Sequence, residues 1–293
     1  MNRCLRLSVV IRTGFASACL ALVLALSAYA SDHGAYSEEF HKTYAIASDG
    51  RVELDNISGA VHIFSWDRPE VKVDAVKYAD SKERLDEARI EIDSEKDRLS
   101  IKTRYPHHDL NFTWGMHDNP ATVEYTLTVP RTIALDEIKL INGSLDVREV
   151  SGQVHAECIN GRLEAHDLAG RAELSTINGR LEAMFKQLSP SSVRLSSING
   201  AVEVTIPSDS QADIEASTIS GGIDNDWGLH VNHHRFVGHD LRGELGNGGT
   251  HIKLEDVNGR IEIRHADDGR ALSPVKDLSG HDHERDSDDE DDM

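Results

Sequence analysis

Hydrophobic and polar residues alternate along most of this chain, and short turns interrupt the alternation at regular intervals. After one such turn Leu145 and Val147 occupy alternate positions, and after the next turn Leu163 and Ala165 do the same. Apolar residues two positions apart predict a β-strand with one buried face. The buried positions carry small or branched aliphatic side chains, and aromatic residues make up only 5% of the chain. This composition fits a thin core between two sheets.

The turns share one tripeptide, Ile-Asn-Gly. Complete or degenerate copies of it begin at Ile57, Ile141, Ile159, Ile177, Ile198, Ile219 and Val257. The spacing is 18 residues between the copies at 141, 159 and 177, and 21 residues between those at 177, 198 and 219. A short fixed period of this kind is typical of a repeat protein in which each unit forms one coil of a solenoid.

Each repeat predicts two short strands and two tight turns. Two strands alone cannot bury their apolar faces in water, so successive repeats are expected to stack about 4.8 Å apart. We therefore predict an all-β fold, a β-solenoid of the parallel β-roll or β-helix type, with about two short strands per coil of 18–21 residues and a less regular N-terminal β region. Asn-Gly between alternating segments is also typical of antiparallel hairpins, so a hairpin meander is the alternative.

The corner residues of the repeats have predicted conformations. The glycines are expected to adopt a positive φ, which a Cβ atom opposes, and equivalent asparagines are expected to stack as a ladder of side-chain amides. The corners predicted in this way are Asn142, Gly143, Asn160, Gly161, Asn178, Gly179, Asn199, Gly200, Asn258 and Gly259.

The N-terminal segment, residues 1–30, has the composition of a signal peptide. Three arginines precede an uncharged apolar run, and Ala28-Tyr29-Ala30 fits the small-x-small rule for a cleavage site. The apolar core is too short to span a bilayer comfortably, so no stable membrane span is expected after cleavage. The mature protein is therefore expected to be exported, to the periplasm or the cell surface.

The mature chain divides into three parts. Residues 31–42 are expected to form a flexible leader, and residues 43–265 a single β-repeat domain. Within that domain the stretch 225–249 is less regular, and the coil after it is expected to cap the stack. Residues 266–293 are expected to be a disordered acidic tail, because the last seventeen residues contain nine acids and one arginine.

Charge and cysteine content restrict the partners and the chemistry. Removal of the predicted signal peptide leaves 28 basic against 51 acidic residues, a formal net charge of −23. Nucleic acids and anionic membrane surfaces attract basic proteins, so neither is an expected partner. Cys158 is the one cysteine outside the signal peptide, which excludes an internal disulfide. It precedes the Ile of its corner, as Thr176 does in the next repeat, and is expected to be a small corner residue rather than a reactive thiol.

A further set of motifs accompanies the repeats. These motifs are Asn56-Ile57-Ser58-Gly59, Ser65-Trp66-Asp67, Val123-Glu124-Tyr125 leading to Val129-Pro130, and Gly243-x-Leu245-Gly246-x-Gly248-Gly249 before a last Val-Asn-Gly. Together with the signal peptide and the Asn-Gly strand repeats, they make the chain resemble the bacterial "putative adhesin" family, β-strand-repeat proteins of unknown function. The resemblance extends from about residue 45 to 265. It implies a solenoid-like fold and a cell-envelope location, and it supplies no catalytic residues.

Charged residues face outward in columns along the predicted stack. One column contains Asp146, Glu164, Glu182, Glu203, Asp224 and Glu262, and a second, two residues earlier in each repeat, contains Arg162, Arg180 and Arg260. Stacked carboxylates repel one another unless arginines or cations lie between them. The columns are thus either a solvated face of paired charges or a flat surface for a polymeric partner or divalent cations, with calcium as the natural choice. The candidate binding residues are Arg162, Glu164, Arg180, Glu182 and Glu203.

Histidines concentrate in the less regular stretch, at His230, His233, His234 and His239. Imidazole binds zinc and copper well, which makes these residues candidate metal ligands. No carboxylate or thiol pattern completes a tetrahedral set around them. We therefore predict polar loop residues here, with no metal site and no cofactor.

Enzyme motifs are missing from the sequence: it contains no phosphate-binding loop, no zinc-protease helix and no Gly-x-Ser-x-Gly elbow. The expected function is accordingly a non-enzymatic one in the cell envelope, by adhesion, scaffolding or sensing, with an envelope protein or glycan as partner. Two alternatives are a β-helix enzyme that acts on polysaccharides and a periplasmic protein that binds metal ions or other cations. The residues do not identify the partner, the oligomeric state or the handedness of the coil.

Overall fold

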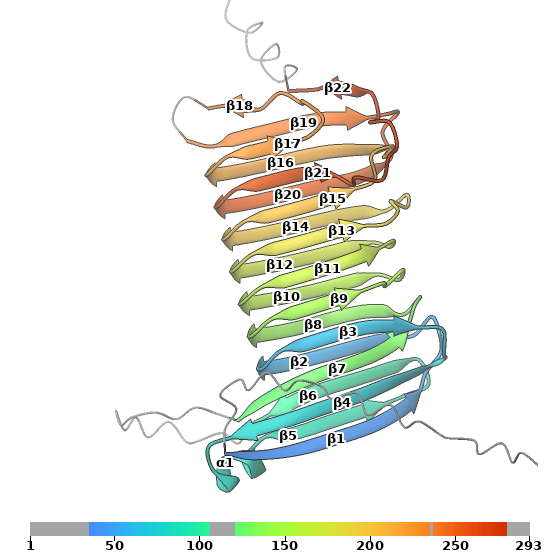
Figure 1. Cartoon of the computed structure of the whole chain (residues 1–293), viewed down its shortest axis with the longest axis vertical. Helices are drawn as coiled ribbons and strands as arrows, with labels where there is room; N and C mark the ends of the chain where they lie inside the picture. The colour runs from blue at the N-terminus through green and yellow to red at the C-terminus, as the bar shows by residue number, and fades with distance from the viewer. Residues whose placement is uncertain (1–34, 106–120, 235–236, 280–293) are drawn as a thin grey trace, which may run out of the picture. The chain divides into compact units, whose positions relative to one another are not determined.

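The computed structural model describes residues 35–105, 121–234 and 237–279. Apart from the short helix α1 (Lys82–Glu87), the regular elements of these residues are strands, which form two large, mostly parallel sheets (Figure 1). The predicted signal peptide, the segment 106–120 and residues 280–293 of the predicted tail lie outside the described residues.

We call the two sheets sheet A and sheet B. In spatial order sheet A contains β1 (Tyr36–Ala45), β4 (Glu70–Ala79), β7 (Thr122–Pro130), β3 (Val61–Trp66), β9 (Leu145–Arg148), β11 (Leu163–Leu168), β13 (Leu181–Phe185), β15 (Val202–Ile206), β21 (Ile261–His265) and β17 (Ile223–Asn225). In spatial order sheet B contains β18 (Asn232–His233), β19 (His239–Leu245), β16 (Ala212–Ser220), β20 (Thr250–Asn258), β14 (Ser192–Asn199), β12 (Ala172–Asn178), β10 (Val154–Asn160), β8 (Ala134–Asn142), β2 (Arg51–Ser58), β6 (Arg98–Arg104) and β5 (Arg89–Ser94). A last strand, β22 (Val275–Asp277), pairs with the outer side of β19.

Successive strands of the repeats alternate between the two sheets, and each strand pairs in parallel with its equivalent in the next repeat. β8, β10, β12 and β14 are neighbours in sheet B, while β9, β11, β13 and β15 are neighbours in sheet A. Their register aligns equivalent residues, so that Asn160 lies between Asn142 and Asn178. Parallel pairing of like residues confirms the two-sheet arrangement predicted from the repeats and excludes a hairpin meander in this region.

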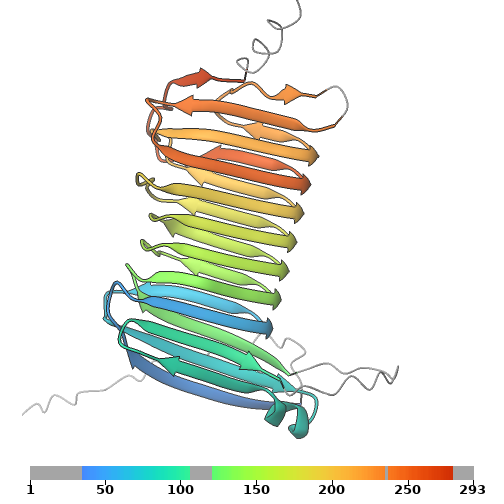
Figure 2. The same cartoon turned by 180° about the vertical axis from the view of Figure 1, so that it is seen from behind.

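The order of the last repeats differs from the prediction. β20 pairs with both β14 and β16, and β21 pairs with both β15 and β17, so the final repeat lies between two earlier ones. The prediction that this repeat caps the stack is therefore wrong. Beyond β16, sheet B continues instead with β19, which pairs antiparallel with β16 (Figure 2). β19 buries Leu241 and Leu245 and pairs on its outer side with the short strands β18 and β22. One physical reason lies at the corner of the repeat. Asn258 continues the amide ladder from Asn199, whereas Ser220 has no side-chain amide and cannot continue it.

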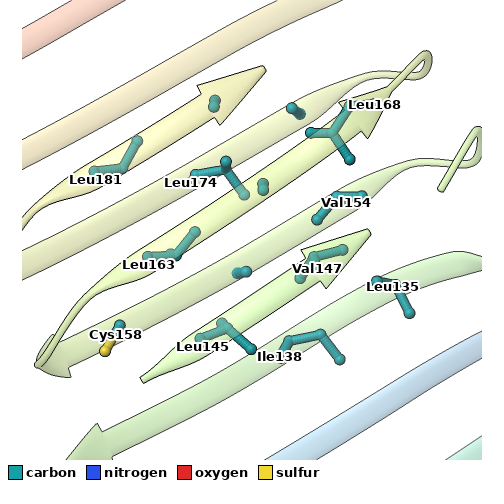
Figure 3. Packing of buried hydrophobic residues seen from close by; sticks show 14 of the residues in the cluster. Leu135, Ile138, Leu145, Val147, Val154, Cys158, Leu163, Leu168, Leu174 and Leu181 are labelled. Carbon is teal, nitrogen blue, oxygen red and sulfur yellow. The ribbon is translucent and has the colours of Figure 1, made fainter. Parts of the chain in front are cut away.

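The core lies between the inward faces of the two sheets. Leu145, Leu163 and Leu181 occupy the same position on successive strands of sheet A and are at most 1% exposed (Figure 3). Burial of one such leucine contributes roughly 1.5–3 kcal/mol. The alternating burial along nearly every strand agrees with the period-two pattern of the sequence. Tyr125 is an aromatic exception, fully buried in the N-terminal region, where its hydroxyl hydrogen-bonds with Thr103 at 2.9 Å.

Glycine is required at the corners because backbones of successive repeats approach closely. A Cβ atom on Gly161 would lie 1.7 Å from the carbonyl oxygen of Gly143, and one on Gly179 would lie 1.8 Å from that of Gly161. The predicted positive φ is confirmed at both residues, with values of 150° and 151°. Gly259 lies outside that φ range, yet a Cβ there would approach the Gly200 oxygen to 1.7 Å. At this corner the close approach of the backbones alone excludes a larger residue.

Both ends of the predicted β-repeat domain contain more regular structure than expected. The predicted flexible leader, 31–42, is a strand from Tyr36 onward, because β1 pairs with β4 along its whole length and packs Phe40 and Tyr44 against the core. At the other end, β22 lies within the predicted disordered tail, 266–293.

Candidate functional site: the charged face of sheet A

The outward face of sheet A presents the carboxylate column that the sequence predicts. Its members pair in register across neighbouring strands, in the spatial order Asp146, Glu164, Glu182, Glu203, Glu262 and Asp224. Every strand of the column except β17 places its acid between two buried residues, as Glu164 lies between Leu163 and Ala165. The alternation of the strand therefore directs these acids outward.

Arginines lie beside the carboxylates. Arg162 Nη1 is 3.0 Å from Glu164 Oε1, and Arg180 Nε is 3.5 Å from Glu182 Oε2. Arg180 also donates a hydrogen bond to Glu203 in the next strand, and Glu203 is the main reason that the pKa of Arg180 is raised. The five candidate residues of this face thus form two sets of ion pairs, Arg162 with Glu164 and Arg180 with Glu182 and Glu203.

The same pattern continues at both ends of the column. Arg148 Nε is 3.0 Å from Asp146 Oδ1, and Arg260 Nη1 is 3.5 Å from Asp224 Oδ2. Arg264 Nη2 is 2.7 Å from Glu262 Oε2. The arginines offset the repulsion between stacked carboxylates, although each exposed pair contributes no more than about 1 kcal/mol.

The arginines are more exposed than the acids that they neutralise. The side chains of Glu164, Glu182 and Glu203 are 25%, 22% and 19% exposed, whereas those of Arg162 and Arg180 are 59% and 52% exposed. A partner that approaches this face therefore meets guanidinium groups before carboxylates. Guanidinium groups bind carboxylate, sulfate or phosphate groups in bidentate fashion.

The corner motif forms a different surface, at the C-terminal ends of the strands of sheet B. The asparagine side chains form the predicted ladder: Asn160 Nδ2 donates to Asn142 Oδ1 at 2.9 Å, and Asn178 Nδ2 donates to Asn160 Oδ1 at 2.8 Å. The isoleucines of the motif point outward and are 36–55% exposed at Ile141, Ile159, Ile177, Ile198 and Ile219. The sequence motif therefore combines an amide ladder with an exposed aliphatic column.

The four candidate histidines do not converge on one point. The rings of His233 and His239 are in edge-to-face contact, with centroids 4.6 Å apart. His234 contacts Asp240, and His230 takes part through its backbone oxygen, which accepts a hydrogen bond from Ser279. In the described ranges of the chain, no three His, Cys, Asp or Glu residues are arranged to hold a metal ion.

Cys158 lies at the inner side of the corner. It is 1% exposed, and its thiol donates to the carbonyl oxygen of Gly143 at 3.5 Å. Burial raises the pKa of this thiol to about 11. A thiol that is buried and protonated at neutral pH is unreactive.

Asp256 occupies the same position in the last repeat and was not singled out from the sequence. It pairs with Ser197 on one side and Thr218 on the other, and only 4% of it is exposed. Burial raises the pKa of this carboxyl to about 6. The signal was available, because alignment of the repeats places an acid where the four preceding copies have Cys158, Thr176, Ser197 and Thr218.

A polar groove runs along the turns at the opposite ends of the repeats. One part has a volume of about 730 Å³ and is lined by Arg131, Glu149 and Asp167 among others. A second part, of about 430 Å³, shares Lys186 and Arg270 with the first. The second part of the groove is bordered by the turns around residues 186–191 and 207–211.

Comparison with known proteins finds similarity among solved structures only. No family model and no curated protein matches this chain. A "putative cell adhesion protein" from Clostridium sporogenes ATCC 15579 is 12% identical over 79% of this chain and 100% of that chain, with a TM-score of 0.45. A "putative adhesin" from Bacteroides fragilis NCTC 9343 is 11% identical over 78% of this chain and 97% of that chain, with a TM-score of 0.29. A "putative lipid binding protein" from Parabacteroides distasonis ATCC 8503 is 11% identical over 80% and 95%, with a TM-score of 0.27.

The names of the first two structures agree with the family resemblance seen in the sequence. Among the described residues, no helix combines the length and the apolar character needed to cross a membrane.

Proposed function

We propose that this chain is an exported, non-enzymatic β-solenoid of the bacterial cell envelope that acts by binding, in adhesion or scaffolding. The predicted signal peptide supports export, and the parallel, in-register repeats support the solenoid. Its location is the periplasm or the cell surface, and it uses no cofactor.

The observation that carries this proposal is the set of charged columns on sheet A. Acids of neighbouring strands lie in register, and arginines such as Arg162 and Arg180 cover them. A solvated face requires no such regularity, whereas a partner with a repeating structure can contact several equivalent guanidinium groups at once. Multiple equivalent contacts raise the affinity without any single strong site.

The partner that fits this face carries acidic groups or dense hydroxyl groups, as an anionic envelope glycan or an acidic protein segment does. The net charge of the protein is −20, so long-range attraction does not favour such a partner. Binding must therefore depend on short-range contacts with the arginines. Divalent cations are the alternative ligand, but the low exposure of the carboxylates makes the arginine contacts the better supported choice.

The test is capture of envelope components by the immobilised protein, with and without a chelator. A variant with Arg162, Glu164, Arg180 and Glu182 replaced together by alanine is expected to lose the captured component. The matched control replaces four outward charges of sheet B, Glu173, Arg194, Lys253 and Glu215, and is expected to retain the component. Equal capture by both variants contradicts the proposal, and loss of capture in the chelator indicates the cation-binding alternative.

The polar groove favours a second candidate function, action on a polysaccharide. Glu149 and Asp167 line it, occupy equivalent positions 18 residues apart in the sequence, and adopt positive φ values of 58° and 57° that are uncommon for these residues. Incubation with soluble anionic polysaccharides such as polygalacturonate tests this candidate. The candidate function requires that the wild-type protein forms product and that Asp167→Asn does not.

A further inference from the structure

β1 is an unusually long and exposed edge strand. It forms one end of sheet A, and in the described part of the chain β4 is the only strand that pairs with it. β1 contains ten residues, whereas the opposite edge strand of sheet A, β17, contains three. The outermost strands at the far end of sheet B, β18 and β22, contain two and three. Short edge strands prevent unwanted pairing, so a long one is a candidate for pairing with another chain.

The outer side of β1 is accessible. Eight of its ten residues are exposed, and Phe40 and Tyr44 are half-buried against the core. At about 3.4 Å per residue the strand offers roughly 34 Å of backbone for pairing. Addition of a strand from another chain to such an edge is a common mode of protein association.

The sequence of β1 is complementary to itself when read in opposite directions. With Phe40 as the centre, an antiparallel second copy places Lys42 opposite Glu38 and His41 opposite Glu39. The two residues of each of these pairs are an even number of positions apart, so their side chains point to the same face of the sheet. Centring on Glu39 instead would place two glutamates opposite each other, and centring on His41 would place Glu38 opposite Tyr44.

We propose that β1 pairs antiparallel with β1 of a second copy of this chain, in a symmetric dimer centred on Phe40. Sheet A then continues across the two-fold axis from one protomer into its partner. This interface is separate from the charged face of sheet A and does not rest on the proposed function.

The charged side chains of β1 are available for this contact. Glu38 is 53% exposed although its carboxylate lies 2.8 Å from Lys77 Nζ, and Glu39 is 69% exposed. Lys42 lies 5.0 Å from the ring of Tyr44 and forms no ion pair with the described residues of its own chain. Opposite charges directly across an antiparallel pair stabilise the pairing, and like charges destabilise it. Reversal of the charge of one of the two residues therefore turns their attraction into repulsion.

Sedimentation velocity across micromolar concentrations tests the proposal with two single variants. Glu38→Lys places two lysines opposite each other, and Lys42→Glu places two glutamates opposite each other. Each variant alone is expected to raise the dimer Kd at least tenfold. A mixture of the two restores opposite charges at both pairs and is expected to dimerise as the wild type does.

The design separates the interface from effects within one protomer. The double variant Glu38→Lys/Lys42→Glu carries the same lysine beside Lys77 as the single variant and is expected to recover dimerisation. If the singles are unstable, the mixture and the double variant still report on complementarity. A wild-type protein that stays monomeric throughout the concentration range, or a mixture that does not associate, overturns the proposal.

Cross-linking tests the register itself. In a Cys158→Ala background, Phe40→Cys places two cysteines across the two-fold axis and is expected to form a disulfide-linked dimer under mild oxidation. Lys42→Cys is the control, because its two copies lie four residue positions out of register and cannot be bridged without movement of the backbone. Faster cross-linking at position 42 than at position 40 contradicts the proposed centre.

Discussion

Asn258 donates a hydrogen bond from its side-chain amide to Asn199 Oδ1 at 3.0 Å, although 59 residues separate the two in the sequence. The contact joins the final repeat to the repeat that begins two turns earlier, and Ser220 lies on the far side of Asn258. The corner ladder therefore continues from Asn199 to a repeat that is not the next one in the sequence.

Asn258→Ala should weaken the stack at this junction. The substitution removes a hydrogen bond that contributes about 1 kcal/mol, so the free energy of unfolding is expected to fall by roughly 0.5–1.5 kcal/mol. Urea denaturation measures this change. Asn247→Ala, in the exposed turn 246–249, is the control and should leave the midpoint unchanged; an equal loss in both variants would contradict a specific role for the ladder.

Gly179→Ala should be much more damaging than a surface substitution. Its Cβ would lie 1.8 Å from the Gly161 carbonyl oxygen, so neighbouring repeats must separate to admit it. A loss of at least about 3 kcal/mol in the free energy of unfolding is expected, or failure to fold. Gly222→Ala is the matched control, because a Cβ there meets no atom within 4 Å; thermal unfolding of the two variants provides the comparison.

The fold could be predicted from the sequence wherever a residue occupies the same structural position as its counterpart in the other repeats. Alternation identified the buried face, and the constant corner identified the parallel register, so the carboxylate column that contains Glu164 and Glu182 was found correctly. The order of the last repeats could not be found in this way, since similar repeats offer similar edges and any of them could pair. The amide of Asn258, which is absent at Ser220, is one feature that distinguishes the neighbour of Asn199.

The chemistry of the candidate face was only partly predictable. Spacing placed Arg162 and Arg180 beside the acids, but their greater exposure depends on side-chain conformations that a pattern does not encode. The strand β1 was missed because its charged residues, such as Glu38 and Lys42, resemble those of a solvated leader. Pairing with β4 and the packing of Phe40 outweigh that composition.

Asp256 should make stability depend on pH. Its folded pKa is raised to about 6 by burial, above the ordinary value of 3.8. The folded state therefore binds the proton more tightly than the unfolded state, so this contribution to stability is fully present below about pH 4 and is lost as the pH rises through 6. Asp256→Asn should remove that dependence and raise the free energy of unfolding at pH 7.5 by on the order of 1 kcal/mol.

Urea denaturation of wild type and Asp256→Asn at pH 5 and pH 7.5 measures this effect. The difference in stability between the two proteins should be greater at pH 7.5 than at pH 5. Glu255→Gln, a substitution of the outward-facing acid next to it, is the control. A pH dependence that persists unchanged in Asp256→Asn would show that another group is responsible.

Cys158 should be inert while the protein is folded. With the thiol buried and its pKa raised to about 11, iodoacetamide at pH 8 is expected to leave it unmodified for hours and to modify it rapidly in urea. Mass spectrometry of the intact protein counts the added groups. Rapid labelling of the folded protein would contradict the position of Cys158 inside the corner.

Disulfide trapping at the corner tests most directly the claim that like residues lie over one another in parallel, with the final repeat inserted between two earlier ones. In a Cys158→Ala background, Asn199→Cys paired with Asn258→Cys should form an intramolecular disulfide, because residues paired on neighbouring strands lie within bridging distance. Asn199→Cys paired with Ser220→Cys should not, since β20 separates their strands. Efficient bridging of 199 to 220, with none from 199 to 258, would contradict the account.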